Sequence, residues 1–159
     1  MKNFKKGFTL IELLIVVAII GIIASVVLAV LNQARTKGTD AAIKSNLVNA
    51  MKQAEIFYAT NTAASNSYTN VCSTTSPTGG AQTLTLHMVA AAKARGLASP
   101  YYTVNGTGST STATCNSSAT AWAAEVPLKD VVGMWCVDST GKSSKKTNSI
   151  GATTVCPAI

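Results

Sequence analysis

The chain has 159 residues, of which 47% are hydrophobic and 12% are charged. Once an apolar N-terminal segment is set aside, this length suits one small domain rather than two. Basic side chains outnumber acidic ones by 13 to 6, but Lys2, Lys5 and Lys6 supply part of that excess. The remaining positive charge is too weak to require a nucleic-acid partner.

A long apolar segment follows this short basic N-terminus. No charged residue occurs from Leu13 to Leu31, and Ile, Val, Leu and Ala fill most positions. A helix of this length would measure about 28 Å, which matches a hydrocarbon core of about 30 Å. Because the preceding lysines have no acid among them, the positive-inside tendency keeps the N-terminus in the cytoplasm and exports the rest of the chain.

Glu12 is a carboxylate at the edge of this apolar segment. Such a group is costly inside a membrane and calls for a partner. The first turn of a helix that begins near Phe8 supplies part of the stabilisation, because its exposed amide groups favour an anion. The surrounding sequence Lys5-Lys6-Gly7-Phe8-Thr9-Leu10-Ile11-Glu12 resembles the processing site of the type IV pilin-like family, which includes pilins and type II secretion pseudopilins.

The resemblance implies a role for each residue of this motif. A prepilin peptidase would cleave between Gly7 and Phe8 and methylate the new amine of Phe8. Glu12 would face the amino terminus of a neighbouring subunit during assembly. The expected parts are a leader (residues 1–7), a membrane and assembly half-helix (8–31) and a head (32–159).

The resemblance also implies partners and a location. We expect a single-pass protein of the inner membrane, N-terminus inside and C-terminus outside, that later enters an extracellular fibre. Its partners would be copies of itself, other pilins, the prepilin peptidase, an inner-membrane assembly platform and, before assembly, membrane lipid.

An ordinary signal peptide and a plain membrane anchor both fit the N-terminal segment less well. A signal peptide has an apolar region of about 7 to 15 residues, which is shorter than the one present. A plain anchor would not account for the order of residues from Gly7 to Glu12. One departure from the family is that residues 26–31 lack the helix-kinking proline that many pilins carry, so a kink stays open.

The helix is expected to continue beyond the membrane face. Apolar residues recur at helical spacing in an amphipathic half-helix (residues 40–59), and the stripe comprises Ile43, Leu47, Met51, Ala54 and Tyr58. Gly38 is a weak point that costs about 1 kcal/mol relative to Ala. We expect one helix from Phe8 to about Ala59, with two helices broken near Gly38 as the alternative.

The rest of the chain alternates loops with short elements. Residues 60–80 are predicted to be a loop, and residues 83–97 a helix capped by Thr83 and stopped by Gly96. The predicted strands are residues 101–104, 121–128 and 131–137, with Lys129-Asp130 joining the last two as an antiparallel hairpin and residues 107–118 as a surface loop. The expected class is α+β, with the long helix lying across a small antiparallel sheet.

The chain has four cysteines, and all lie on the predicted outer side: Cys72, Cys115, Cys136 and Cys156. None forms a C-x-x-C motif, so disulfides are favoured over a metal site, and three pairings are open. The pilin resemblance implies a bridge between Cys136 and Cys156, closing a C-terminal region of residues 136–156. That pairing leaves Cys72 with Cys115.

The sequence offers no arrangement of base and nucleophile, and we expect no enzyme activity, cofactor or metal. Lys142, Lys145 and Lys146 could contact DNA or another anion, although a solvated surface is the simpler interpretation. The sequence therefore predicts a structural subunit of a type IV pilus-like filament. The alternatives are a type II secretion pseudopilin and a DNA-uptake pilin.

Overall fold

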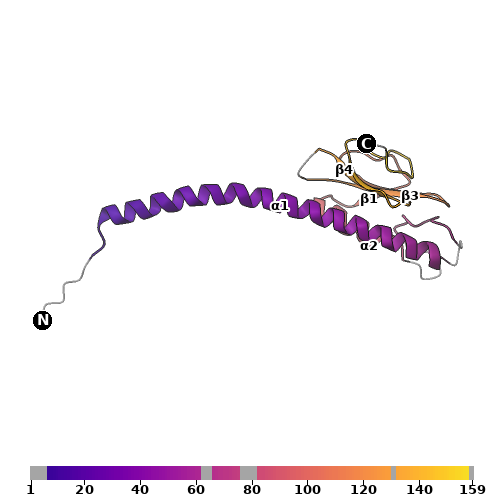
Figure 1. Cartoon of the computed structure of the whole chain (residues 1–159), viewed down its shortest axis with the longest axis horizontal. Helices are drawn as coiled ribbons and strands as arrows, with labels where there is room; N and C mark the ends of the chain where they lie inside the picture. The colour runs from indigo at the N-terminus through magenta and orange to yellow at the C-terminus, as the bar shows by residue number, and fades with distance from the viewer. Residues whose placement is uncertain (1–6, 62–65, 76–81, 130–131, 158–159) are drawn as a thin grey trace. The chain divides into compact units, whose positions relative to one another are not determined.

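The computed structural model describes residues 7–61, 66–75, 82–129 and 132–157. Contacts divide the chain into two compact units, one ending at Arg35 and a second, the head unit, running from Thr36 to Ile159. The described elements are α1 (Leu10–Thr60), α2 (Thr85–Arg95), β1 (Tyr102–Val104), β2 (Ala113–Ser117), β3 (Trp122–Pro127), β4 (Met134–Asp138) and β5 (Ser143–Lys146). Figure 1 labels α1, α2, β1, β3 and β4.

Helix α1 is continuous from Leu10 to Thr60, which confirms the prediction of one long helix. The alternative of a break at Gly38 is wrong. Helix propagation is cooperative, so the cost of a single glycine is absorbed when both flanking stretches are strongly helical. The continuity allows the apolar segment and the head to share one structural element.

The half of α1 that belongs to the head unit buries one stripe of side chains. Ile43, Leu47, Ala50, Ala54 and Phe57 are all 0% exposed and belong to the main hydrophobic core. Their spacing of four, three, four and three keeps them on one helix face. Met51 and Tyr58, which the sequence placed in the stripe, lie at its edge and are partly buried.

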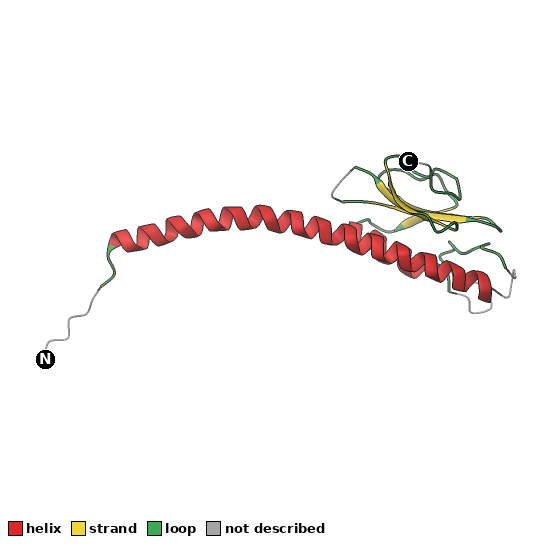
Figure 2. Ribbon diagram, viewed as in Figure 1, coloured by secondary structure: helices red, strands yellow, loops and turns green. Residues whose placement is uncertain are grey.

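The sheet has five strands in the order β1-β2-β3-β4-β5. Its strands are drawn in yellow in Figure 2. Strands β2 to β5 pair antiparallel, as predicted for β3 and β4. The pair β1 and β2 is parallel, with Tyr102 opposite Ala113, so the expectation of an antiparallel sheet throughout was wrong at this edge. The reason is the connection: residues 105–112 carry the chain back along the sheet instead of closing a hairpin.

Two strands lie where the sequence did not indicate them. Residues 107–118 were expected to be a surface loop, but they contain β2, whose first four residues are buried. Strand β5 lies within the C-terminal closing region. Both strands are rich in small or polar residues and lack the alternation of large apolar side chains that identified β3 and β4.

The sheet has two faces of different character. On one face, Trp122, Ala124 and Val126 join the main core with the α1 stripe, as the alternation predicted. The other face carries Ala123 and Cys136, which form a second cluster with Ile150 and Cys156 of the C-terminal segment. The closing region therefore covers the second face.

Helix α2 closes one side of the main core. Leu84, Met88 and Ala91 are buried on one face, as expected. The cap differs from the prediction, because Leu84 and not Thr83 occupies the N-cap position and makes no side-chain capping bond. The stop at Gly96 is as predicted, since this residue takes the left-handed conformation (φ 89°) that favours glycine.

Candidate assembly and processing site

The first half of α1 exposes an almost unbroken apolar surface. Phe8 is 88% exposed, and the large apolar residues from Leu10 to Leu31 lie between 46% and 80% exposed. A soluble monomer does not sustain a surface of this kind. By length and composition α1 can cross a membrane near the N-terminus, so this surface fits either lipid or other helices.

Thr9 and Glu12 hydrogen-bond to each other at the start of α1. The backbone N–H and the hydroxyl of Thr9 both donate to Oε2 of Glu12 at 2.8 Å, and the backbone N–H of Glu12 donates to Oγ1 of Thr9 at 3.3 Å. This reciprocal arrangement is a capping box. Its signal is present in the sequence, because Thr9 precedes Glu12 by three residues, although the role predicted for Glu12 did not depend on it.

The capping box leaves the Glu12 carboxylate partly available. Oε2 accepts both bonds from Thr9, whereas Oε1 accepts none from the part of the chain that the structure describes. Glu12 is exposed, so a donor from another molecule can reach Oε1. Thr9 thus fixes the carboxylate at the helix end while one oxygen stays open.

The expected cleavage point lies just before this capping box. Gly7 and Phe8 are exposed and precede α1 in a non-helical segment. The rest of the expected leader, residues 1–6, lies outside the described residues. The bond between Gly7 and Phe8 is therefore exposed and lies outside the hydrogen-bonded helix, which suits a processing site.

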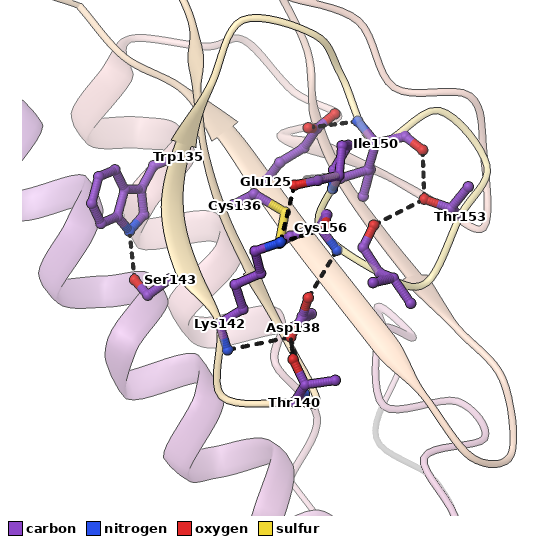
Figure 3. The surroundings of a disulfide bond; sticks show 12 residues. Glu125, Trp135, Cys136, Asp138, Thr140, Lys142, Ser143, Ile150, Thr153 and Cys156 are labelled. Carbon is purple, nitrogen blue, oxygen red and sulfur yellow. Dashed lines mark hydrogen bonds between the residues drawn. A yellow bond between two sulfur atoms is a disulfide. The ribbon is translucent and has the colours of Figure 1, made fainter. Parts of the chain in front are cut away.

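Two disulfides join distant parts of the head. Cys72 is bonded to Cys115 and Cys136 to Cys156, which is the pairing implied by the family resemblance. The first bridge ties the loop after α1 to β2, inside the main core. The second ties the C-terminal segment to β4, as the close view in Figure 3 shows.

Asp138, at the end of β4, fixes both the following turn and the C-terminal segment. Its Oδ1 accepts from the hydroxyl and N–H of Thr140 and the N–H of Lys142, and its Oδ2 accepts from the N–H of Cys156 at 2.8 Å (Figure 3). Burial raises the pKa of Asp138, but these hydrogen bonds outweigh it, so the net pKa is lowered.

Glu125 is a second buried acid, in the middle of β3. It is 0% exposed; the hydroxyl of Ser149 donates to its Oε1, and the N–H of Ile150 donates to its Oε2 at 2.9 Å. Burial raises the pKa of Glu125, and the two hydrogen bonds offset this only in part. A Cβ at Gly108 would collide with Oε1 of Glu125 and Oγ of Ser149, so a side chain there would displace this pair.

The three lysines considered for DNA contact do not form one exposed cluster. Lys142 is half-buried, and its Nζ donates to the carbonyl oxygens of Cys156 and Pro157 at 3.3 and 3.2 Å. Lys146 is 5% exposed, and its Nζ is enclosed. Lys145 alone of the three is exposed. This geometry does not provide the phosphate-binding surface that the sequence suggested.

Two comparisons with known proteins find matches to part of the chain. The model of the prokaryotic N-terminal methylation motif matches residues 2–28. Over 70 residues the chain is 46% identical to the type IV wide pilus major component PilA4 of Thermus thermophilus, an alignment that covers 44% of this chain and 50% of that protein. The chain therefore spans about half the length of this curated relative. No solved structure matches it.

Proposed function

We propose that this chain, which has the N-terminal methylation motif of the type IV pilin family, is the major structural subunit of a type IV pilus. The observation that carries the proposal is the exposed apolar half of α1 with the Thr9 and Glu12 capping box at its start. The similarity to PilA4, a wide pilus major component, supports the same role. The protein is structural and not an enzyme.

Processing precedes assembly in this proposal. Hydrolysis of the peptide bond between Gly7 and Phe8 consumes one water and removes the lysine-bearing leader. A methyl group from a sulfonium donor then replaces one hydrogen of the freed Phe8 amine. Both residues are exposed and lie outside the helix, which supports access by a prepilin peptidase.

The membrane serves as a store of subunits. Residues 8–31 span the inner membrane with the N-terminus in the cytoplasm and the head outside, since the lysines precede the apolar segment. The assembly platform then transfers the subunit into the extracellular fibre together with other pilins. There the apolar half-helices pack on one another instead of on lipid.

Glu12 sets the axial register of the fibre. A carboxylate surrounded by apolar helices is costly unless a cation neutralises it. The amine of Phe8 in an adjacent subunit is such a cation, and Oε1 of Glu12 is free to accept its hydrogen bond while Oε2 stays on Thr9. The pair is favourable at one stagger of the two helices and is lost at others.

We favour a pilus over a secretion pseudopilus, because the similarity is to PilA4, a pilus component. The two disulfides hold a head rich in small side chains and suit any oxidising compartment outside the cytoplasm.

The test combines mass analysis with one variant. Sheared surface fibres are expected to contain a polypeptide that begins at N-methylated Phe8 and has both disulfides. Glu12→Ala is expected to be cleaved and inserted in the membrane normally but to give no fibres. Normal fibres from this variant, or a mature protein that retains Met1 to Gly7, would contradict the proposal.

A further inference from the structure

We propose that the sheet of the head unit binds one small monovalent anion, of which chloride is the type, between Ser144 and Lys146 of the edge strand β5. We call this the anion site, and its ligands are Oγ of Ser144 and Nζ of Lys146. Both atoms are enclosed, and neither has a hydrogen-bond partner among the described residues. The inference concerns the folded head alone and does not depend on fibre formation.

The strand pairing places both side chains on the covered second face of the sheet. Ser144 is opposite Cys136 and Lys146 is opposite Met134 in the pairing of β5 with β4. Residues directly opposite each other share a face, and Cys136 belongs to the cluster that the C-terminal segment covers. Lys146 is 5% exposed. Its ammonium group therefore lies beneath the closing region and not in solvent.

The charged neighbours of Lys146 agree with a side chain that runs along β5 toward Ser144. Lys142 lies two residues before Ser144, so the two share a face, and its carbonyl oxygen accepts the N–H of Asp138. Burial lowers the pKa of Lys146, the charge of Lys142 lowers it further, and Asp138 acts in the opposite direction. Both charges lie on the Ser144 side of Lys146, so their influence fits an Nζ that is turned toward Oγ of Ser144.

The two atoms need an acceptor that carries negative charge. An ammonium group has three donors and no acceptor, and the hydroxyl of Ser144 has one hydrogen to donate. The two groups are not hydrogen-bonded to each other. A buried ammonium without a counter-charge is strongly disfavoured. A water molecule accepts hydrogen bonds but brings no charge, whereas one monovalent anion supplies both.

The described acids on this face are bonded elsewhere. Both oxygens of Asp138 accept from groups of the turn after β4 and of the C-terminal segment. Both oxygens of Glu125 accept from the C-terminal segment, and Glu125 lies two strands from Ser144, or about 10 Å at the usual strand spacing. Asp130 lies outside the described residues, and the test therefore includes it.

The packing around Lys146 favours a small ion over phosphate or sulfate. Gly133, which precedes β4, lies so close to β5 that an added Cβ would be 2.6 Å from the carbonyl oxygen of Lys146. Nζ of Lys146 and Oγ of Ser144 are both enclosed. A halide fits between two enclosed donors with less displacement of the covering segment than a tetrahedral oxyanion requires.

The test measures whether chloride stabilises the full chain in a non-ionic detergent. Urea unfolding is followed by tryptophan fluorescence as chloride rises from about 5 mM to about 500 mM, with gluconate in its place so that ionic strength is constant. Above its Kd, one bound chloride raises the folding equilibrium constant about tenfold for each tenfold rise in concentration. We expect this dependence for the wild type.

Two variants remove the two ligands separately. Lys146→Met keeps a side chain of similar length without the charge, so it is expected to abolish the chloride dependence whatever its own stability. Ser144→Ala removes one donor and is expected to raise the Kd for chloride on the order of tenfold. Because Ser144→Ala is a small change, it keeps the test decisive if Lys146→Met does not fold.

The matched control is Lys145→Met. Lys145 is exposed and lies opposite Trp135, on the other face of β5. This variant changes the net charge by the same amount as Lys146→Met and is expected to keep the chloride dependence of the wild type. An equal loss of the dependence in both lysine variants would assign it to overall charge and overturn the inference.

Chloride-35 NMR measures binding without unfolding the protein. The wild type and Lys145→Met are expected to broaden the chloride signal, and bromide is expected to reverse the broadening by competition. An unbroadened signal together with chloride-independent stability would mean that Lys146 is neutral or bonded to water, and would overturn the inference. Chloride dependence that occurs only in Asp130→Asn would identify Asp130 as the partner of Lys146 and would also overturn it.

Discussion

The backbone N–H of Cys156 donates to Oδ2 of Asp138 at 2.8 Å, two residues along β4 from Cys136, the disulfide partner of Cys156. The C-terminal segment is thus held to one strand by a covalent bond and by a carboxylate. Because Asp138 also closes the turn between β4 and β5, one side chain couples the edge strand to the closing region.

Asp138→Asn should destabilise the head at neutral pH. An amide nitrogen in place of one carboxylate oxygen sets a donor against the donor of Thr140, Lys142 or Cys156, at a cost of about 1 to 3 kcal/mol. Urea unfolding of the full chain in detergent, followed by tryptophan fluorescence, measures the difference.

The difference in free energy of unfolding between wild type and Asp138→Asn should decrease as the pH falls. The pKa of Asp138 is lowered in the folded head, so its contribution to stability is complete above the ordinary Asp value of about 3.9. That contribution is lost as the pH falls through the lower folded pKa. The gap between wild type and Asp138→Asn should therefore shrink in strong acid; a gap that is constant down to about pH 2 would contradict this mechanism.

Glu125→Gln, unlike Asp138→Asn, should not destabilise the head at neutral pH. The pKa of Glu125 is raised by burial, so the ionised form is disfavoured in the folded head. Stability of the wild type then falls as the pH rises from the ordinary Glu value of about 4.3 through the raised folded pKa. The neutral glutamine escapes this loss while it can still accept the N–H of Ile150.

The measurement compares free energies of unfolding at about pH 4 and about pH 7, below and above the ordinary Glu value. We expect Glu125→Gln to equal wild type at the lower pH and to match or exceed it at the higher one. Glu55→Gln is the control, because Glu55 is exposed and bonded to the hydroxyl of Tyr68. A loss of stability by Glu125→Gln that grows with pH would refute the role of burial.

Much of the fold could be predicted from the sequence where apolar spacing defined it. The helix stripe was confirmed at Ile43, Leu47 and Ala54, with Met51 and Tyr58 at its edge, and the alternation around Trp122 was confirmed as well. Strand β2 was missed because its burial depends on polar contacts: Nδ2 of Asn116 donates to the carbonyl oxygens of Gly151 and Thr153. No local periodicity reports a partner that distant in the sequence.

The candidate site could also be predicted only where it depends on local sequence. The place of Glu12 in the motif was evident, and its bond to Thr9 follows from a local pattern that was overlooked. The burial of Lys146 could not be foreseen, because lysine is almost always exposed. It results from the pairing of Lys146 with Met134 across β5 and β4, which depends on the whole sheet.

Removing the two disulfides should have different consequences. Cys72 and Cys115 are separated by 43 residues and Cys136 and Cys156 by 20, so loop entropy predicts losses of about 4 and about 3 kcal/mol. Replacing each pair with alanine and measuring urea unfolding tests the order.

The double variant Cys136→Ala/Cys156→Ala should also lose hydrogen-exchange protection locally, in the C-terminal segment. Without the bridge to Cys136, the amides of Ile150 and residue 156, which donate to Glu125 and Asp138, should lose protection from hydrogen exchange. The amides of β3 should stay protected. Equal loss of protection in both double variants would mean that the closing region is not an independent unit.

Asp40→Ala should loosen the attachment of the loop between β3 and β4. Oδ1 of Asp40 accepts the N–H of Lys129 at 2.7 Å, and Asp40 is 6% exposed. Its removal leaves a partly buried donor unpaired, at a cost of about 1 to 3 kcal/mol. Asp40→Asn keeps an acceptor and is the matched control, so urea unfolding should show a smaller loss for it. Equal losses would show that the hydrogen bond to Lys129 is not the cause.

Thr9→Val and Glu12→Gln should separate helix capping from subunit register. Thr9→Val removes the hydroxyl that donates to Oε2 of Glu12 but keeps the charge, so the first turn should fray while fibres still form. Glu12→Gln keeps an oxygen that can accept the Thr9 N–H but has no charge to pair with the Phe8 amine of a neighbour, so capping should persist while fibres are lost.

Hydrogen exchange at the start of α1 in detergent reports capping, and electron microscopy of sheared cells reports fibres. If Thr9→Val abolishes fibres while Glu12→Gln preserves them, the helix cap and not the charge of Glu12 directs assembly. Glu12 would then act only by capping its own helix and not by pairing with a neighbouring subunit.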